Sequence, residues 1–148
     1  MRRLLPPLLL ILAIALMLLL HRFAPGLHWP PVPWRSWGGM ATVVLGLGIA
    51  QWHARLFRRR GTNLHTFREP QQLVTEGLFR HSRNPMYLGF ALAAAGLALA
   101  LGAATPVLVL AAFVLMLDRW YIRFEEQAML RSFGQAYRDY CRHTRRWF

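Results

Sequence analysis

The sequence predicts an all-α integral membrane protein of four transmembrane helices, the last two a helical hairpin, plus a cytoplasmic C-terminal amphipathic helix. Two observations predict this class. The chain of 148 residues is 55% hydrophobic, and three segments contain no charged side chain, residues 4–20, 36–54 and 84–117. A helix needs roughly 20 apolar residues to cross a bilayer core, so the first two segments fit one crossing each. The length suits one domain.

The third segment is too long for one crossing and a little short for two. Gly102 and the pair Thr105-Pro106 interrupt it near the middle, which favours a tight helical hairpin. At about 1.5 Å per residue, the arm from residue 86 to 101 covers roughly 24 Å, less than the ~30 Å of a typical core.

The charge pattern predicts the orientation in the membrane. The net charge is +12, and all 18 basic residues are arginines. Only Arg22 and Arg35 lie between the first and second apolar segments. Because arginines accumulate on the cytoplasmic side, both termini are predicted to be cytoplasmic. The arginines favour contact with anionic lipid head groups over binding to nucleic acid.

Other features exclude further classes. The single cysteine, Cys141, cannot form a disulfide within the chain, and no cysteine pair has metal-ligand spacing, so no metal site is predicted. The N-terminal segment lacks an evident cleavage site before His21, which favours a retained helix over a signal peptide.

The second apolar segment is rich in glycine. Gly38, Gly39, Gly46 and Gly48 all fall within it. Small residues let helices approach closely in lipid, so close packing against a neighbouring helix is expected.

A polar strip, residues 73–89 (LVTEGLFRHSRNPMYLG), leads into the hairpin. The residue before a proline is pushed away from helical angles, whereas proline suits the first helical turn, so Asn84-Pro85 predicts the start of a helix. A strip so rich in hydrogen-bond donors is costly beside a membrane unless it binds something or faces water.

A second polar cluster follows the hairpin, with Asp118, Arg119, Arg123, Glu125 and Glu126. Because a hairpin brings its ends together, the two clusters are expected to meet at the cytoplasmic rim of the bundle. Ionisable residues at membrane depth are functional candidates. The residues predict a polar pocket without naming its ligand.

The last apolar helix is expected to continue to about Tyr140. Leu130, Phe133, Tyr137 and Tyr140 then fall on one helical face, which indicates packing or membrane contact. The final residues, RHTRRWF, predict a basic and aromatic surface anchor.

Two motifs carry a resemblance to a known family. GLFRHSRNPMYLG at residues 77–89 and EEQAMLRSFGQAYRDY at residues 125–140 resemble the isoprenylcysteine carboxyl methyltransferase family and its bacterial relatives. The resemblance covers residues 61–148. It implies a single membrane domain, residues 1–148, in which residues 1–60 form two transmembrane helices and residues 61–148 the cofactor-binding core, in a bacterial inner membrane.

The resemblance implies S-adenosyl-L-methionine as cofactor. Glu125 matches the glutamate that faces the cofactor's ammonium, and backbone donors at the start of the helix after Asn84 suit the cofactor's carboxylate. The full cofactor-binding set is Gln72, Leu73, Val74, Phe79, Arg83, Asn84, Pro85, Met86, Tyr87 and Glu125.

The substrate side departs from the eukaryotic pattern. Those enzymes have an arginine for the prenylcysteine carboxylate where this chain has Tyr121, and Arg119 or Arg123 is the expected replacement. Together with Glu126, these are the substrate-side candidates. The eukaryotic enzymes also have His at Asn84 and Tyr at Phe79. A lipid or another small lipophile therefore stays open as the substrate.

Three functions remain. The leading one is O-methylation of a carboxylate on a lipophilic substrate, which needs no general base. The second is phospholipid N-methylation, for which Glu126, His81 or Tyr87 would have to serve as base. The third is a non-catalytic protein that keeps the fold for packing or lipid binding.

Overall fold

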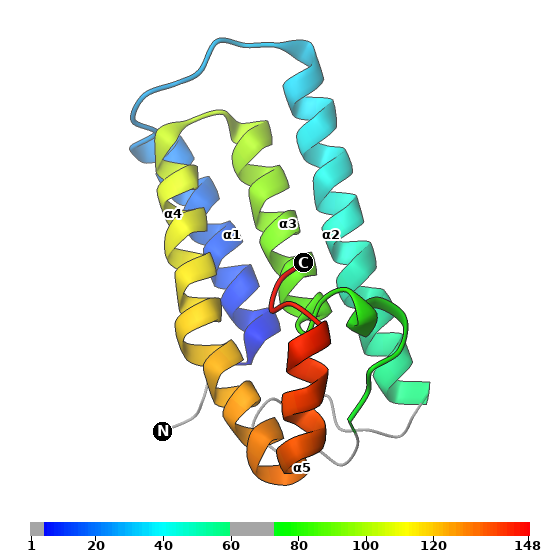
Figure 1. The fold of residues 1–148 in the computed structure, drawn as a ribbon. Helices are drawn as coiled ribbons and strands as arrows, with labels where there is room; N and C mark the ends of the chain where they lie inside the picture. Colours follow the sequence, from blue (N-terminus) through cyan, green and yellow to red (C-terminus); the bar gives the residue numbers. More distant parts are fainter. Residues whose placement is uncertain (1–4, 60–72) are drawn as a thin grey trace.

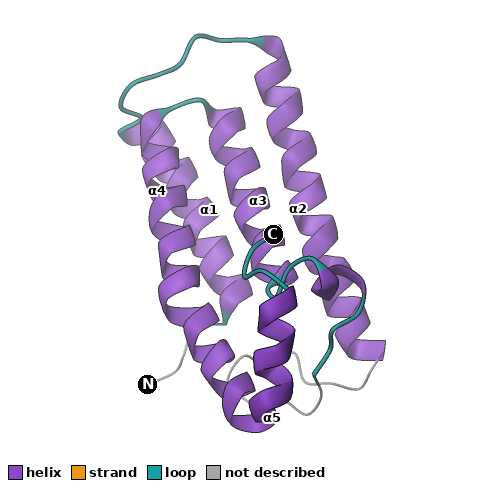
Figure 2. Cartoon of the chain, viewed as in Figure 1, coloured by secondary structure: helices purple, strands orange, loops and turns teal. Residues whose placement is uncertain are grey.

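The computed structural model describes residues 5–59 and 73–148, and this part of the chain is helical, without strands (Figure 2). Four helices lie side by side, with a fifth beneath them (Figure 1). Their bounds are α1 Pro6–Phe23, α2 Pro33–Arg59, α3 Pro85–Leu101, α4 Ala104–Met116 and α5 Arg123–His143. A 3-10 turn, Gly77–Arg80, precedes α3, and a π-helical turn, Leu117–Ile122, joins α4 to α5. The all-helical class is confirmed.

Helix α1 packs on α4 and α3 through a narrow face. It begins at Pro6, because proline presets the backbone angle of a first helical turn. Leu10, Ala13 and Met17 follow at spacings of three and four and are buried, as expected for one side of a helix.

Two pairs of glycines bring α2 and α3 into backbone contact. A Cβ added at Gly39 would lie 2.6 Å from the carbonyl oxygen of Gly96, and one added at Gly89 would lie 2.6 Å from that of Gly46. No Cβ fits at such distances. The predicted close packing is confirmed for Gly39 and Gly46, whereas an added Cβ at Gly48 would meet nothing within 4 Å.

The break in the third apolar segment falls where the sequence predicted it. Helix α3 ends before Gly102, which adopts a left-handed conformation with φ 61°. The segment between α1 and α2 closes over this turn, because the amide of Trp29 donates to the carbonyl of Gly102 at 3.0 Å and the amide of Ala104 to that of Leu27 at 2.9 Å.

The C-terminal helix expected to continue to about Tyr140 is present, but it is interrupted. Helix α5 folds back at Gly134, whose φ of 50° and ψ of −117° are not helical. Its two arms, residues 123–133 and 135–143, are the orange and red helices at the base of Figure 1. The stripe predicted for Leu130 and Tyr137 is therefore split between arms, with Leu130 39% exposed and Tyr137 6%.

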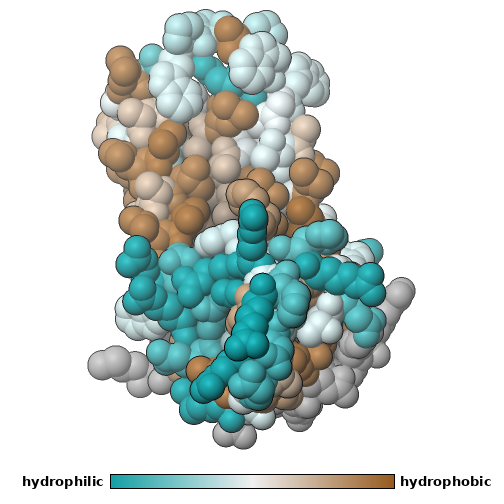
Figure 3. Space-filling view, viewed as in Figure 1, coloured by the Kyte–Doolittle hydropathy of each residue, from teal (hydrophilic) through white to brown (hydrophobic). Residues whose placement is uncertain are grey.

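Within the described ranges, α1 is the one helix whose length and composition suffice to cross a membrane. Helix α3 is apolar but has 17 residues, about 26 Å of rise. Figure 3 shows an apolar body above a polar lower part. Large apolar side chains of the helices are exposed, among them Ile11 at 60%, Val44 at 64% and Leu108 at 68%.

Candidate functional site

The two polar clusters meet where α3 begins and α5 begins. The hydroxyl of Tyr87, in the first turn of α3, donates a hydrogen bond of 2.7 Å to Oε1 of Glu125, in the first turn of α5. Tyr87 is 1% exposed, so this bond lies at the inner edge of the site. The hairpin α3–α4 carries the two residues to the same end of the bundle, as expected.

Glu126 lies between two arginines. Nη2 of Arg83 is 2.9 Å from its Oε1, and Nη2 of Arg146 is 2.6 Å from its Oε2. Each guanidinium also donates from Nε to Oε1, at 3.2 and 3.3 Å. Such forked, charge-assisted bonds are strong and directional. The bond to Glu126 raises the pKa of Arg146, and the Glu126 side chain lies between two guanidinium groups.

The C-terminal segment, residues 144–147, packs across the polar strip. The amide of Arg83 donates to the carbonyl of Arg145 at 2.9 Å, and Nη1 of Arg83 to that of Thr144 at 2.8 Å. Nδ2 of Asn84 donates to the carbonyl of Arg146 at 3.1 Å.

Trp147 connects the C-terminal segment to Asp118 of the second polar cluster. Its Nε1 donates to Oδ1 of Asp118 at 3.0 Å, and its ring packs on the apolar core. The predicted surface anchor is therefore wrong for Arg146 and Trp147, whose side chains donate to Glu126 and Asp118 inside the site, whereas Arg145 is exposed. Phe148 alone of this tail's aromatic residues stays exposed, at 77%.

The predicted cofactor residues fall into three groups. Asn84, Pro85, Met86 and Tyr87 start α3, where Pro85 occupies the first turn as predicted. Val74 and Phe79 are buried and Leu73 is half-buried, and the carbonyl of Phe79 accepts a hydrogen bond of 2.7 Å from Tyr140. Gln72 lies outside the described residues. Arg83 and Glu125 lie at the contacts given above.

The predicted substrate-side residues are separated. Tyr121 is buried in the core beside Tyr87, with ring centroids 6.4 Å apart. The side chain of Arg119 is 65% exposed and lies 3.4 Å from Asp118. Of the four substrate-side candidates, Arg123 and Glu126 line a pocket, which Arg83 also lines.

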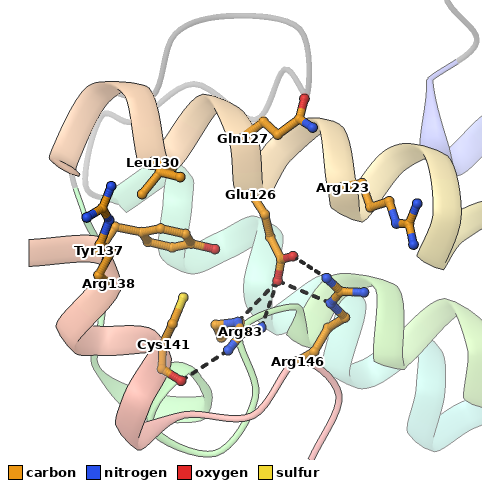
Figure 4. Close-up of a pocket in the computed structure, with 9 residues that line it drawn as sticks. All are labelled: Arg83, Arg123, Glu126, Gln127, Leu130, Tyr137, Arg138, Cys141 and Arg146. Atoms are coloured by element: carbon orange, nitrogen blue, oxygen red, sulfur yellow. Dashed lines mark hydrogen bonds and ion pairs between the residues drawn. The ribbon is translucent and has the colours of Figure 1, made fainter. Parts of the chain in front are cut away.

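This pocket lies between the two arms of α5 and has a volume of about 530 Å³ (Figure 4), within the range of roughly 300–1,000 Å³ typical of small-molecule sites. Its walls come from both arms, the polar strip and the tail. They are Arg83, Arg123, Glu126, Gln127, Leu130, Tyr137, Arg138, Cys141 and Arg146. The fold-back at Gly134 is what makes the arms face each other.

Two tyrosines of the second arm stay protonated at neutral pH. Burial raises the pKa of Tyr137, and the nearby Glu126 carboxylate raises it further. Burial raises the pKa of Tyr140 to about 12. Their hydroxyls are therefore hydrogen-bond donors rather than phenolates.

Sequence reasoning missed Arg146, Trp147, Tyr137 and Cys141 as site residues. The available signal was Gly134, since a glycine inside a helical pattern often marks a break. A fold-back there returns the tail toward the polar strip.

The structure shows a bundle of apolar helices with a polar site at one end, and comparison with known proteins specifies the family. The family model for phospholipid methyltransferases matches residues 34–136, more than half of the chain, and the chain belongs to that family. It is also 31% identical over 129 residues to protein-S-isoprenylcysteine O-methyltransferase B of Arabidopsis thaliana, a match covering 82% of this chain and 62% of that protein. The predicted family resemblance is thus confirmed. No solved structure matches.

Proposed function

We propose that the protein is an S-adenosylmethionine-dependent methyltransferase that acts at the membrane on a lipophilic substrate, with O-methylation of a carboxylate as its reaction. The Tyr87–Glu125 hydrogen bond of 2.7 Å carries this proposal, because it joins the two family motifs at one buried point. The plant relative is named an O-methyltransferase, which supports O-methylation. The chain spans 62% of that relative's length, so substrate and activity are proposed for this chain on its own residues.

The residues at this point fit the cofactor. S-adenosylmethionine carries an ammonium and a carboxylate, and supplies a methyl carbon activated by its sulfonium. Glu125, held by the Tyr87 hydroxyl, is an anion for the ammonium. Pro85 has no N–H, so the backbone amide of Met86, next in the first turn of α3, is the donor for the carboxylate, because the first amides of a helix have no partner within it.

The chain's task in this reaction is orientation and exclusion of water. Fixing two reactants in line can supply about 7–11 kcal/mol of the barrier. A carboxylate acceptor is already nucleophilic and needs no base. Glu126 fits that chemistry, because both of its carboxylate oxygens already pair with arginines, at 2.9 and 2.6 Å, so it is not a free base.

Phospholipid N-methylation is the second candidate, favoured by the description of the matching family. An ammonium head group must lose a proton before it attacks, so this reaction needs a free base. Tyr137 and Tyr140 do not supply one at neutral pH, because burial raises the pKa of both hydroxyls. Incubating membranes with radiolabelled cofactor separates the candidates: mild alkali releases the label from methyl esters as methanol and leaves N-methyl groups intact.

We extend the proposal to the membrane arrangement. Four helices crossing the bilayer, with both termini cytoplasmic, would place outward-facing residues such as Val44 and Leu108 against lipid. The site would then lie at the cytoplasmic surface, where a lipophilic substrate arrives from the bilayer.

Cofactor binding to the purified full-length protein tests the function. We expect saturable calorimetric binding that weakens about tenfold or more in Glu125→Gln, because the ammonium loses its anion. Asp139→Asn removes the same charge from an exposed position of the same helix and is expected to bind like the wild type. Equal cofactor affinity in both variants would show that the cofactor does not bind at Glu125. No cofactor binding by folded protein would refute the proposed enzyme.

A further inference from the structure

The pocket between the arms of α5 has an excess of positive charge. Four guanidinium groups line it, from Arg83, Arg123, Arg138 and Arg146, against the single carboxylate of Glu126. The other lining residues are neutral. A partly enclosed site with this balance attracts anions and repels cations.

The side chains of two of the four arginines make no ion pair or hydrogen bond within the described part of the chain. These are Arg123 on the first arm and Arg138 on the second, both exposed. In Figure 4 they lie at opposite ends of the pocket, with Glu126, Arg83 and Arg146 between them. Glu126 pairs with Arg83 and Arg146, and Asp118 pairs with Arg146 at 3.4 Å. The charges of Arg123 and Arg138 therefore give the pocket capacity for a further anion.

The middle of the pocket already displays carboxylate recognition. Glu126 accepts forked bonds from Arg146, whose Nη2 is 2.6 Å from Oε2 and whose Nε is 3.3 Å from Oε1. Planar guanidinium groups match carboxylates in this two-point manner. The side chain of Arg146 is 33% exposed, so it remains reachable from the pocket.

An apolar flank accompanies the charges. Leu130 of the first arm and the ring of Tyr137 of the second both line the pocket. Figure 4 shows them at the Arg138 end. A pocket with positive charge beside an apolar wall suits an anion attached to a hydrocarbon chain better than an inorganic ion.

We propose that this pocket binds an aliphatic carboxylate, and that Arg146 of the C-terminal tail is the residue that selects for it, with Arg83 and Arg123 as supporting cations. Two sources supply such a group: the methyl acceptor, which rests on the proposed function, and the amino-acid end of the cofactor.

Binding of octanoate to the full-length protein in neutral detergent tests the site without the cofactor. We expect saturable binding by calorimetry, weakened about tenfold or more in Arg146→Gln and partly restored in Arg146→Lys. Arg145→Gln is the matched control, because Arg145 is exposed and contributes its backbone carbonyl to Arg83. Octylammonium, with the same chain and opposite charge, is expected to bind about tenfold more weakly or not at all.

A second variant tests the site in case Arg146→Gln fails to fold. Arg123→Gln removes an exposed side chain that has no partner in the described structure, so the fold should persist while octanoate binding weakens a few-fold. Equal octanoate affinity in Arg146→Gln and Arg145→Gln would overturn the role of Arg146. Equal binding of octylammonium, or tighter binding of octyl phosphate than of octanoate, would overturn the assignment to a carboxylate.

Two nucleosides identify the source of the carboxylate. S-adenosylhomocysteine carries the amino-acid carboxylate, and methylthioadenosine lacks it. If Arg146→Gln weakens octanoate but neither nucleoside, the acceptor is the source. If it weakens octanoate and S-adenosylhomocysteine but not methylthioadenosine, the cofactor is the source. Octanoate binding that persists in protein unable to bind the cofactor would support this site and refute the proposed function, so the two proposals fail separately.

Discussion

The carboxylate of Glu126 and the guanidinium of Arg146 lie 2.6 Å apart, although 20 residues separate them along the chain. Between the two positions α5 turns back on itself at Gly134. Arg83 joins the same carboxylate from the start of α3, at 2.9 Å. One carboxylate thus ties together the polar strip, the first arm of α5 and the C-terminal tail.

Replacing Glu126 by glutamine should loosen this junction. The variant leaves Arg83 without its anion and Arg146 with Asp118 alone at 3.4 Å. The two arginine side chains are 15% and 33% exposed. Because these groups are partly solvated, we expect a loss of about 1–2 kcal/mol, below the 3–5 kcal/mol typical of fully buried pairs. Thermal unfolding in detergent measures it.

The same variant should expose the tail. Carboxypeptidase is expected to remove the last residues faster from Glu126→Gln than from the wild type, because Arg146 loses its partner on α5. Asp139→Asn, an exposed carboxylate on the second arm, serves as control. Equal digestion of both variants would show that hydrogen bonds to the tail's backbone, such as that from Asn84, hold it without Glu126.

The interface of α2 and α3 gives a prediction about stability. Gly46→Ala places a Cβ against the backbone of Gly89 and Ala93, which cannot move without separating the helices. Overpacking of this kind costs about 1–3 kcal/mol. Gly48→Ala on the same helix meets nothing within 4 Å and should be neutral or slightly stabilising, since alanine favours helix. Circular dichroism during heating compares them, and equal melting would mean that the two helices are less closely packed.

Local signals predicted much of the fold. Pro85 starts α3 because its ring suits a first helical turn, and Gly102 ends it by adopting positive φ. The meeting of Tyr87 and Glu125 followed from the hairpin between them. The docking of Arg146 could not be predicted this way, because it depends on the direction that the chain takes after Gly134 and on contacts with residues some 60 positions away. A helical period read across Gly134 conceals that change of direction.

Gly134 should therefore determine whether the pocket forms. Its φ of 50° lies in a region that side chains with a Cβ rarely adopt, although an added Cβ would have open space. Gly134→Ala thus changes backbone preference without a steric clash, and we expect it to straighten α5, separate Tyr137 from Leu130 and abolish octanoate binding. Ser132→Ala, exposed two residues earlier, is the control. Octanoate binding and helix content that match the control would contradict the role of this fold-back.

Tyr140 gives a prediction about alkaline pH. Burial raises the pKa of its hydroxyl from the ordinary value of 10.0 to about 12, so the folded state favours the protonated form. Above pH 10 the unfolded chain binds fewer protons than the folded one, and stability must fall as pH rises toward 12. Tyr140→Phe removes this titration and also the 2.7 Å bond to the carbonyl of Phe79. We expect the variant to lose about 1 kcal/mol near neutral pH, and to show a shallower decline between pH 10 and 12 than the wild type. Denaturation at a series of pH values measures both effects, and an unchanged slope in Tyr140→Phe would show that another group, such as Tyr137, dominates the alkaline transition.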